Sequence, residues 1–116
     1  MKPKLLLHLE GGATAALAVL LYVRSGGGWL LFAVLILAPD LSMFGYVLGP
    51  RLGSAVYNAV HNLVLPFALG AAGLLLASQP AVWVALIWTA HIGADRLLGF
   101  GLKYPTEFKD THLARV

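Results

Sequence analysis

The chain has 116 residues, of which 59% are hydrophobic and only 11% are charged, and its mean hydropathy is +0.83. These polar side chains are too few to cover a soluble fold, so the composition excludes a soluble globular domain and predicts one compact membrane bundle. The net charge of +3 comes from scattered basic residues without a basic helix, which argues against nucleic acid as a partner. The absence of cysteine excludes disulfides and thiolate metal sites, so any metal must be held by His, Asp, Glu or backbone oxygen.

Four apolar segments are each close to the roughly 20 residues that a helix needs to cross a membrane. Glycine, proline and interfacial tryptophan mark their ends. We expect helices over about 5–24, 29–48, 53–77 and 81–102, followed by a tail over 103–116. The sequence therefore predicts an all-α, polytopic membrane protein built as a bundle of four transmembrane helices in contact with the lipid bilayer.

The first segment begins with Lys2 and Lys4 before an apolar run, a pattern that also starts a cleaved secretory signal. Glu10 interrupts that run too early for a typical signal, so we expect a retained helix. Two glycines follow Glu10 and permit close approach of another helix. Glu10 itself either joins an interior site or extends to the membrane surface.

Pro39 and Asp40 lie in the middle of the second segment. A proline inside a helix removes a backbone hydrogen bond, so we expect the second helix to be kinked or broken there. In a membrane, such broken backbone is tolerated where it is buried in protein or lines a cavity. Asp40 is then either a functional carboxylate beside unpaired carbonyls or the cap of the second half-helix.

The third segment carries a polar stripe, because Asn58, His61 and Asn62 are spaced three and four residues apart. Pro66 adds another kink position one turn later. Asparagines commonly hold neighbouring membrane helices together, which is the role expected for Asn58 and Asn62. His61 is the candidate ligand, with Asn58 as an additional site residue.

The fourth segment places His91 and Asp95 four residues apart and therefore on one face of a helix, with Arg96 directly after them. The plainer interpretation is an internal salt bridge with a hydrogen-bonded core histidine. At about 1.5 Å of rise per residue, however, five ionisable residues of the four helices fall at a similar depth, which favours one functional site. These residues are Glu10, Asp40, His61, His91 and Asp95.

The polar tail shows no helical stripe, and its Asp110 and His112 would point the same way only on an extended chain. The favoured expectation is a solvated tail. The alternative is a lid that folds over the helix ends and supplies an extra ligand to the site.

Basic residues outside the helices predict the orientation, because Lys and Arg accumulate on the cytoplasmic side. Only Arg24 falls at the opposite end from the others. The others are Lys2, Lys4, Arg51, Lys103, Lys109 and Arg115. Four crossings also put both ends of the chain on one side, so we expect both termini in the cytoplasm.

A mixed set of nitrogen and oxygen ligands suits zinc, iron or manganese. The expected ligands are Asp40, His61, His91 and Asp95. Such a metal could activate a water for hydrolysis of a lipid phosphate or ester, with Asp40 and Asp95 as catalytic ligands or general base. Arg96 or Lys103 would then hold the lipid phosphate.

Three other functions remain open. His61 and His91 could be the axial ligands of one haem. The same side chains could relay protons without a metal, in a homo-oligomer because four helices form a narrow bundle. A structural membrane protein, whose polar core fixes helix pairing, needs none of this chemistry.

The stretches APDLSMFGY, YNAVHN and HIGADRLLGFGLKYPTEFKDTHL resemble the small bacterial membrane proteins of domain-of-unknown-function family 4260. The resemblance covers nearly the whole chain. It implies a location in the bacterial inner membrane and supplies no activity.

A second resemblance is to membrane-bound metal-dependent hydrolases, which carry a Pro-Asp motif, a later histidine-rich motif and a His-x-x-x-Asp helix. The matching positions here are 39–40, then His61, then His91 with Asp95. Ser42 stands where those proteins carry a second acidic residue, and a single histidine replaces their histidine pair. The resemblance therefore implies metal-dependent hydrolysis with a reduced ligand set.

Overall fold

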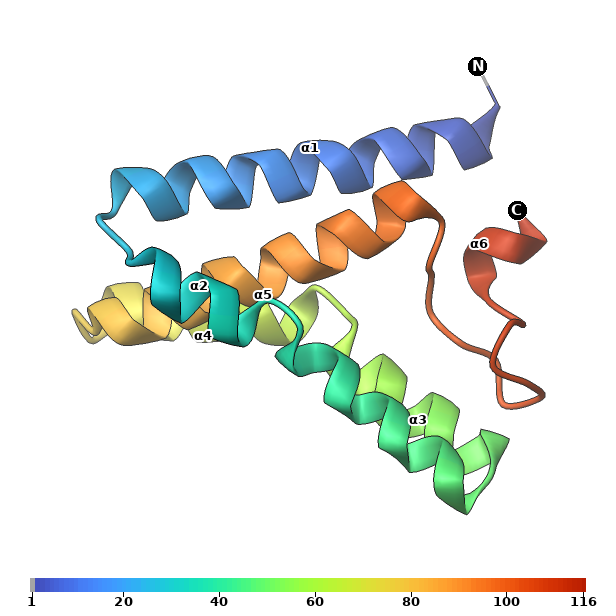
Figure 1. The fold of residues 1–116 in the computed structure, drawn as a ribbon. Helices are drawn as coiled ribbons and strands as arrows, with labels where there is room; N and C mark the ends of the chain where they lie inside the picture. The colour runs from blue at the N-terminus through green and yellow to red at the C-terminus, as the bar shows by residue number, and fades with distance from the viewer. Residues whose placement is uncertain (1) are drawn as a thin grey trace.

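The computed structural model describes residues 2–116, and their helices confirm the predicted all-α fold. Within these residues, four apolar helical stretches are long enough to cross a membrane. They are Pro3–Arg24, Trp29–Leu48, Pro50–Leu75 and Gln79–Leu98. Figure 1 shows the two termini at the same end of the bundle as the turn that joins the second stretch to the third.

The fourth stretch, α5 (Gln79–Leu98), is the central helix of the bundle. It packs along α1 (Pro3–Arg24) and α4 (Val64–Leu75), as Figure 1 shows. Of the residues in its most apolar 18-residue segment, 39% are buried inside the protein, against 11–17% in the corresponding segments of the other three stretches. Gly11 and Gly93 let α1 approach α5 closely, because a Cβ added at Gly93 would lie only 2.7 Å from the Gly11 carbonyl oxygen.

Several helix ends differ from the predicted ones by two to four residues. α5 ends at Leu98 rather than 102, because Gly99 adopts the left-handed backbone conformation (φ +98°) that terminates a helix. The third stretch begins at Pro50 rather than 53, since proline fits the first helical turn, where an N–H donor has no partner. That stretch ends at Leu75 rather than 77, and α1 and α5 each begin two residues early, also with a proline in the first turn.

The second stretch is kinked, as predicted. Its α-helix, α2, spans Trp29–Leu35 and is followed by a 3-10 helix, η1, over Ala38–Leu48. The kink lies just before Pro39, which has no N–H to continue the α-helical bonding pattern. Beyond the kink η1 packs beside α3 (Pro50–Val60), and the two form the diverging hairpin of Figure 1.

The third stretch is also interrupted. α3 ends at Val60, and α4 begins at Val64 after a bend at 61–63. The predicted kink position, Pro66, lies instead in the first turn of α4, where proline is tolerated. The bend therefore falls at the candidate ligand His61 rather than one turn after it.

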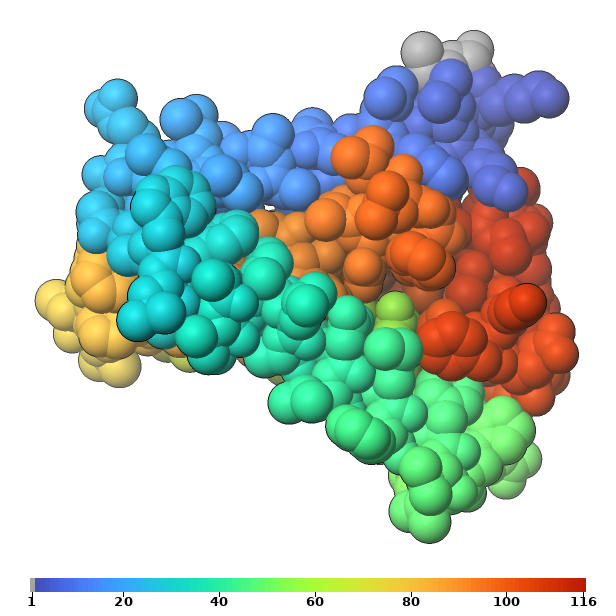
Figure 2. Space-filling model, in the orientation of Figure 1, coloured from blue at the N-terminus to red at the C-terminus, as the bar shows by residue number. Residues whose placement is uncertain are grey.

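The C-terminal segment packs against the helix ends, so the favoured expectation of a solvated tail is wrong. Figure 2 shows it filling the space between the start of α1 and the hairpin of η1 and α3. The Asn58 amide holds it, donating to the Lys103 carbonyl (2.7 Å) and accepting from the Lys103 N–H (2.6 Å). A short helix, α6 (His112–Arg115), buries Leu113, which is 1% exposed.

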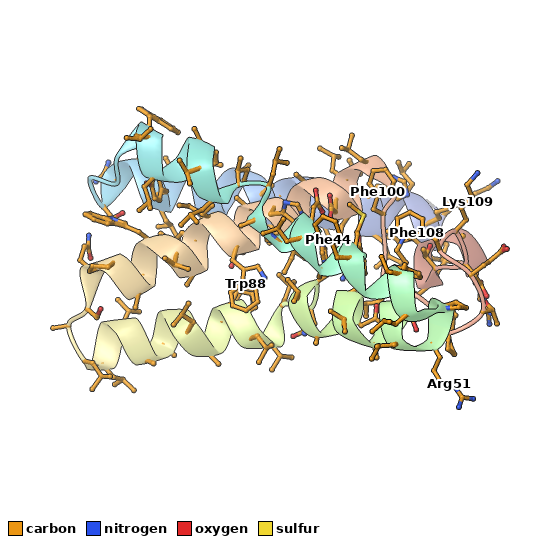
Figure 3. All side chains as sticks on the ribbon, turned by 60° about the horizontal axis from the view of Figure 1, so that its bottom comes forward. Phe44, Arg51, Trp88, Phe100, Phe108 and Lys109 are labelled. Carbon is orange, nitrogen blue, oxygen red and sulfur yellow. The ribbon has the colours of Figure 1, made fainter. Side chains whose placement is uncertain are left out.

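The outer surface of the helices is strongly apolar. Leu30, Val47 and Leu75 are 80%, 81% and 86% exposed, and Figure 3 shows apolar side chains projecting outward around the helices. The labelled basic residues Arg51 and Lys109 lie at one end of the molecule in the same view. An exterior of this kind is stable against lipid, so the chain is a multi-pass membrane protein in contact with the bilayer.

Candidate metal centre

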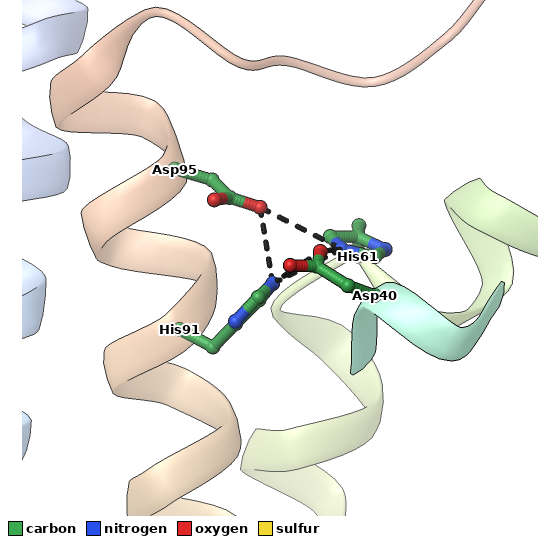
Figure 4. A group of neighbouring side chains, drawn as sticks. All are labelled: Asp40, His61, His91 and Asp95. Carbon is green, nitrogen blue, oxygen red and sulfur yellow. Dashed lines mark hydrogen bonds and ion pairs between the residues drawn. The ribbon is translucent and has the colours of Figure 1, made fainter. Parts of the chain in front are cut away.

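The central helix α5 supplies an imidazole and a carboxylate that face the same way (Figure 4). His91 and Asp95 are separated by four residues, and the Nε2 atom of His91 lies 3.2 Å from an oxygen of Asp95. This spacing stacks side chains on one helix face, as the sequence predicted. α5 therefore provides half of a four-residue cluster.

The kink in the second stretch supplies the third member, Asp40, and fixes the ring of His91. In a continuous α-helix the carbonyl of Ile36 would accept the N–H of Asp40. Here that N–H bonds instead to the carbonyl of Leu37 (3.0 Å). The carbonyl of Ile36 is left free and accepts from Nδ1 of His91 at 2.6 Å.

The bend in the third stretch supplies the fourth member, His61. It directly follows Val60, the last residue of α3, and its Nδ1 donates to the carbonyl of Tyr57 at 2.9 Å. The Tyr57 ring stacks on the imidazole, with the ring centroids 3.7 Å apart. The carbonyl of His61 accepts from Arg96 Nη2 at 2.9 Å, so α5 also holds this bend in place.

The four side chains converge on one small volume (Figure 4). One ligand atom from each lies within 4.8 Å of every other. Asp40 Oδ1 lies 3.1 Å from His91 Nε2 and 3.4 Å from His61 Nε2, and His61 Nε2 lies 3.6 Å from Asp95 Oδ2. Ligands bonded to a tetrahedral zinc at about 2.0–2.1 Å are separated from one another by about 3.3 Å. The distances that include a histidine Nε2, which run from 3.1 to 3.6 Å, match this spacing.

The protonation of the two rings follows from their backbone partners. A carbonyl oxygen can only accept, so Nδ1 of His61 and Nδ1 of His91 both carry the hydrogen. In a neutral imidazole the other nitrogen then has a free lone pair. Both Nε2 atoms therefore present lone pairs to each other and to two carboxylate oxygens, an arrangement that a cation stabilises.

Exposure differs between the two kinds of ligand. His61 and His91 are 2% and 4% exposed, whereas the side chains of Asp40 and Asp95 are 34% and 18% exposed. The imidazoles therefore form the closed back of the cluster. The carboxylates form its more exposed side.

The additional site residues predicted from the sequence do not join the cluster. Asn58 anchors the C-terminal segment, and Arg96 braces the bend at His61. Glu10 is exposed on α1 and lines a separate small cavity. Asp110 is held by Arg115 (2.6 and 2.8 Å), within the C-terminal segment itself.

The remaining candidate, His112, has a structural contact. Its Nδ1 accepts the backbone N–H of Leu102 at 2.8 Å, which fastens α6 to the segment that follows α5. Burial, together with the positive charge of Arg96, lowers the pKa of His112 below its ordinary value. The ring is therefore neutral in the packed tail.

Sequence reasoning missed three groups that support the cluster: Ile36, Ser42 and Tyr57. The Ser42 hydroxyl donates to the carbonyl of Pro39 at 2.8 Å and lies 3.4 Å from Nδ1 of His61. Tyr57 is four residues before His61, so helical spacing could have indicated it. Nothing in the sequence indicates the Ile36 carbonyl, because its role depends on where the kink falls.

Lys103, the first residue of the tail, contacts Tyr57, the aromatic ring that stacks on His61. It is 5% exposed, and its ammonium lies 3.7 Å from the Phe108 ring centroid and 4.8 Å from that of Tyr57. Burial lowers the pKa of Lys103 from its ordinary value. Tyr57 thus lies between a buried cation and the imidazole of His61.

Comparison with known proteins agrees with the first resemblance. The model of the family described as Domain of unknown function (DUF4260) matches residues 4–116. No curated protein and no solved structure matches the chain. The likeness to metal-dependent hydrolases therefore stays a prediction from sequence motifs.

Proposed function

We propose that this chain, which belongs to the DUF4260 family, is a membrane metalloprotein that hydrolyses a phosphate or carboxylic ester of a membrane lipid. Four side chains at two helix breaks and on α5 would hold one divalent ion. They are Asp40, His61, His91 and Asp95.

One observation carries this proposal. Both histidines donate Nδ1–H to a backbone carbonyl, and their free Nε2 atoms lie 3.2 Å apart, facing two carboxylates. Histidines that bind metals almost always donate their other ring N–H to a carbonyl, carboxylate or water in this way. Without a cation, the two lone pairs and two negative charges would repel one another inside a largely buried site.

The donor set narrows the choice of ion. Two imidazole nitrogens and two carboxylate oxygens favour zinc, with iron and manganese as alternatives, and disfavour copper(I), which prefers sulfur. When bound, a zinc ion lowers the pKa of its coordinated water to about 7. The ligands therefore suit hydrolysis near neutral pH.

The roles of the chain's own groups follow from their exposure. His61 and His91 are the buried ligands, with their orientation fixed by the carbonyls of Tyr57 and Ile36. Four protein ligands fill a tetrahedral zinc site, so catalysis would need one of them to leave a position free for water. We assign this role to Asp40, whose carboxylate is the most exposed of the cluster and would accept the proton of the attacking water. Asp95, held on the rigid central helix, would remain the anionic ligand.

The same distances also permit a proton relay. Carboxylate–imidazole separations of 3.1 and 3.2 Å lie within hydrogen-bond range, so protons could occupy the volume assigned to the metal. The two functions differ in what chelation does: it abolishes hydrolysis but leaves proton transfer intact. Haem fits poorly, because axial histidines on opposite faces of one iron would hold their Nε2 atoms about 4 Å apart, with the macrocycle between them.

We further propose that the chain lies in the bacterial inner membrane with both termini in the cytoplasm. The basic residues support this orientation, since Arg51 and Lys109 lie at one end (Figure 3). Because the chain has no cysteine, single cysteines introduced at Lys2 and at Gly28, where a Cβ meets no atom within 4 Å, would report the two sides without background. A membrane-impermeant maleimide added to intact cells should label the Gly28→Cys variant and leave Lys2→Cys unlabelled.

Hydrolysis can be tested on protein in nanodiscs of phosphatidylcholine and phosphatidic acid, in water enriched with ¹⁸O. Transfer of water to a phosphate or acyl group leaves one labelled oxygen in the released acid and a proton on the leaving alcohol. We expect labelled product that disappears after chelation and returns with zinc. A metal-loaded protein that releases no labelled acid, and instead passes protons across liposomes after chelation, would favour the relay.

A further inference from the structure

An apolar groove lies directly beside the four-residue cluster. Its volume is about 270 Å³. Pro39 and Val60 line it and are the chain neighbours of Asp40 and His61, while Ile87 lines it one helical turn before His91. The segments that carry three of the four ligands therefore also form the wall of this groove.

The groove offers contacts for hydrocarbon rather than for polar groups. Its other lining side chains are those of Leu35, Ala38, Val84 and Trp88. The indole N–H of Trp88 is already bonded to the carbonyl of Val60 at 2.6 Å, so it is not free to bind a ligand. Figure 3 shows Trp88 between α5 and α4, within a stretch that crosses the membrane.

Two cationic side chains follow the cluster along the chain. Arg96 directly follows Asp95 on α5, and Lys103 brings a buried ammonium beside Tyr57. Among residues 2–116, neither Arg96 nor Lys103 forms an ion pair with a carboxylate within 4.0 Å. Along α5 and the segment after it, the chain therefore passes from groove-lining apolar residues at 84–88 to the ligands His91 and Asp95 and then to the cations Arg96 and Lys103.

We propose that the substrate is an anionic amphiphile with a hydrocarbon chain, which enters sideways from the bilayer and lays that chain in this groove. Its anionic head then meets Arg96, and its reactive ester lies at the cluster. This inference rests on the proposed metal-dependent function and specifies the substrate class and its binding site. A water-soluble substrate would leave the groove without a role in binding.

Trp88 provides a contact reporter inside the groove. Bromine quenches tryptophan fluorescence at short range, and the chain has three tryptophans. In the Trp29→Phe, Trp83→Phe variant, Trp88 is the single emitter. The probe is 6,7-dibromostearic acid in nanodiscs, and its methyl ester has the same chain without the charge and therefore reports unspecific membrane contact.

We expect the acid to quench Trp88 of the zinc-loaded variant at least several-fold more effectively than the ester, with saturation near one acid per protein. Adding Ala38→Leu or Val84→Phe, which fill the groove, should remove this difference while zinc content stays at one per chain. As a matched control, a variant that retains only Trp29, which is 60% exposed, should be quenched equally by acid and ester.

The outcomes separate the two proposals. Equal quenching of Trp88 by acid and ester in a protein that holds one zinc would overturn the groove assignment and leave the metal centre standing. The groove assignment would also be overturned if the acid still quenched Trp88 more strongly than the ester in both the Ala38→Leu and the Val84→Phe variants. A protein that takes up no metal would overturn the proposed function itself, and the substrate assignment with it.

Discussion

Nε2 of His61 and Nε2 of His91 lie 3.2 Å apart, although 30 residues separate them in the chain. Each ring is fixed from behind by a backbone carbonyl: His91 by that of Ile36, which the kink of the second stretch frees, and His61 by that of Tyr57 in the last turn of α3, where the third stretch bends. The two helix breaks therefore position the cluster. The kink before Pro39 and the bend at 61–63 lie close together, because Asp40 at the kink lies 3.4 Å from His61 at the bend.

Replacement of Pro39 tests this dependence on the kink. In Pro39→Ala the restored N–H allows α-helical bonding, so the Asp40 N–H competes with His91 for the Ile36 carbonyl. Loss of a partner behind a ligand typically lowers metal affinity roughly 10- to 100-fold, and we expect a decrease of this size in zinc titrations. Pro80→Ala, in the first turn of α5 and distant from the cluster, is the control and should bind zinc normally. Unchanged affinity in Pro39→Ala would disprove the role of the kink.

Neutralising one carboxylate tests the ligand set. Asp95→Asn keeps an oxygen near His91 but removes the negative charge of the carboxylate. Loss of a residue that only supports a ligand lowers metal affinity by up to roughly 100-fold, so loss of a ligand itself should lower zinc affinity by more than that. Asp110→Asn removes a carboxylate whose pKa Arg115 lowers to about 2, but which lies outside the cluster. Competition with a fluorescent chelator measures both variants, and equal affinities would exclude Asp95 as a ligand.

The fold could be predicted in outline because the four apolar stretches are long and clearly bounded. The helix ends could not be predicted to the residue, since the conformation of Gly99 and the start at Pro50 depend on backbone geometry. His91 and Asp95 could be paired from helical spacing alone. Their meeting with Asp40 and His61 depends on two helix breaks. The spacing of apolar residues in the sequence does not indicate the exact positions of these breaks or the free carbonyl of Ile36.

The tail illustrates a different reason for a wrong expectation. Its sequence is polar, which favours solvation, but Asn58 supplies both hydrogen-bond partners for the backbone of Lys103. Phe108 then packs edge-on to Tyr46, with ring centroids 5.1 Å apart. These long-range contacts outweigh local composition, and no spacing rule within the tail reveals them.

Close packing of α1 on α5 is tested at Gly93. A Cβ there would lie 2.6 Å from the backbone nitrogen of Ala15, so the helices must move apart in Gly93→Ala. We expect a loss of about 1–3 kcal/mol in the free energy of unfolding, typical of overpacking, measured by denaturation in detergent. Gly28→Ala is the matched control, since a Cβ at Gly28 meets no atom within 4 Å. Equal stability of both variants would contradict the close contact.

Attachment of the tail should depend on pH through His112. Because burial lowers the pKa of His112 in the packed tail, the detached tail binds a proton more readily than the packed one. This contribution to packing is complete above the ordinary pKa of 6.5 and decreases as pH falls from 6.5 through the lowered value. Hydrogen exchange at the backbone of Leu102 and Lys103 should therefore accelerate below about pH 6.5, after correction for intrinsic exchange rates.

His112→Asn supplies the control for this pH dependence. The asparagine oxygen can accept the Leu102 N–H in place of Nδ1 but does not titrate. Exchange in this variant should be nearly independent of pH between 5 and 7. A pH dependence as steep as that of the parent chain would assign the effect to another group.

The central claim is that the cluster of Asp40, His61, His91 and Asp95 holds one metal ion, and metal content by mass spectrometry on purified protein tests it most directly. The parent chain and the His8→Ala variant, whose histidine lies outside the cluster, should each carry close to one zinc, iron or manganese per chain. The His61→Ala, His91→Ala variant should carry essentially none. Substoichiometric metal in the parent chain after reconstitution with all three ions, unchanged in the double variant, would contradict the claim.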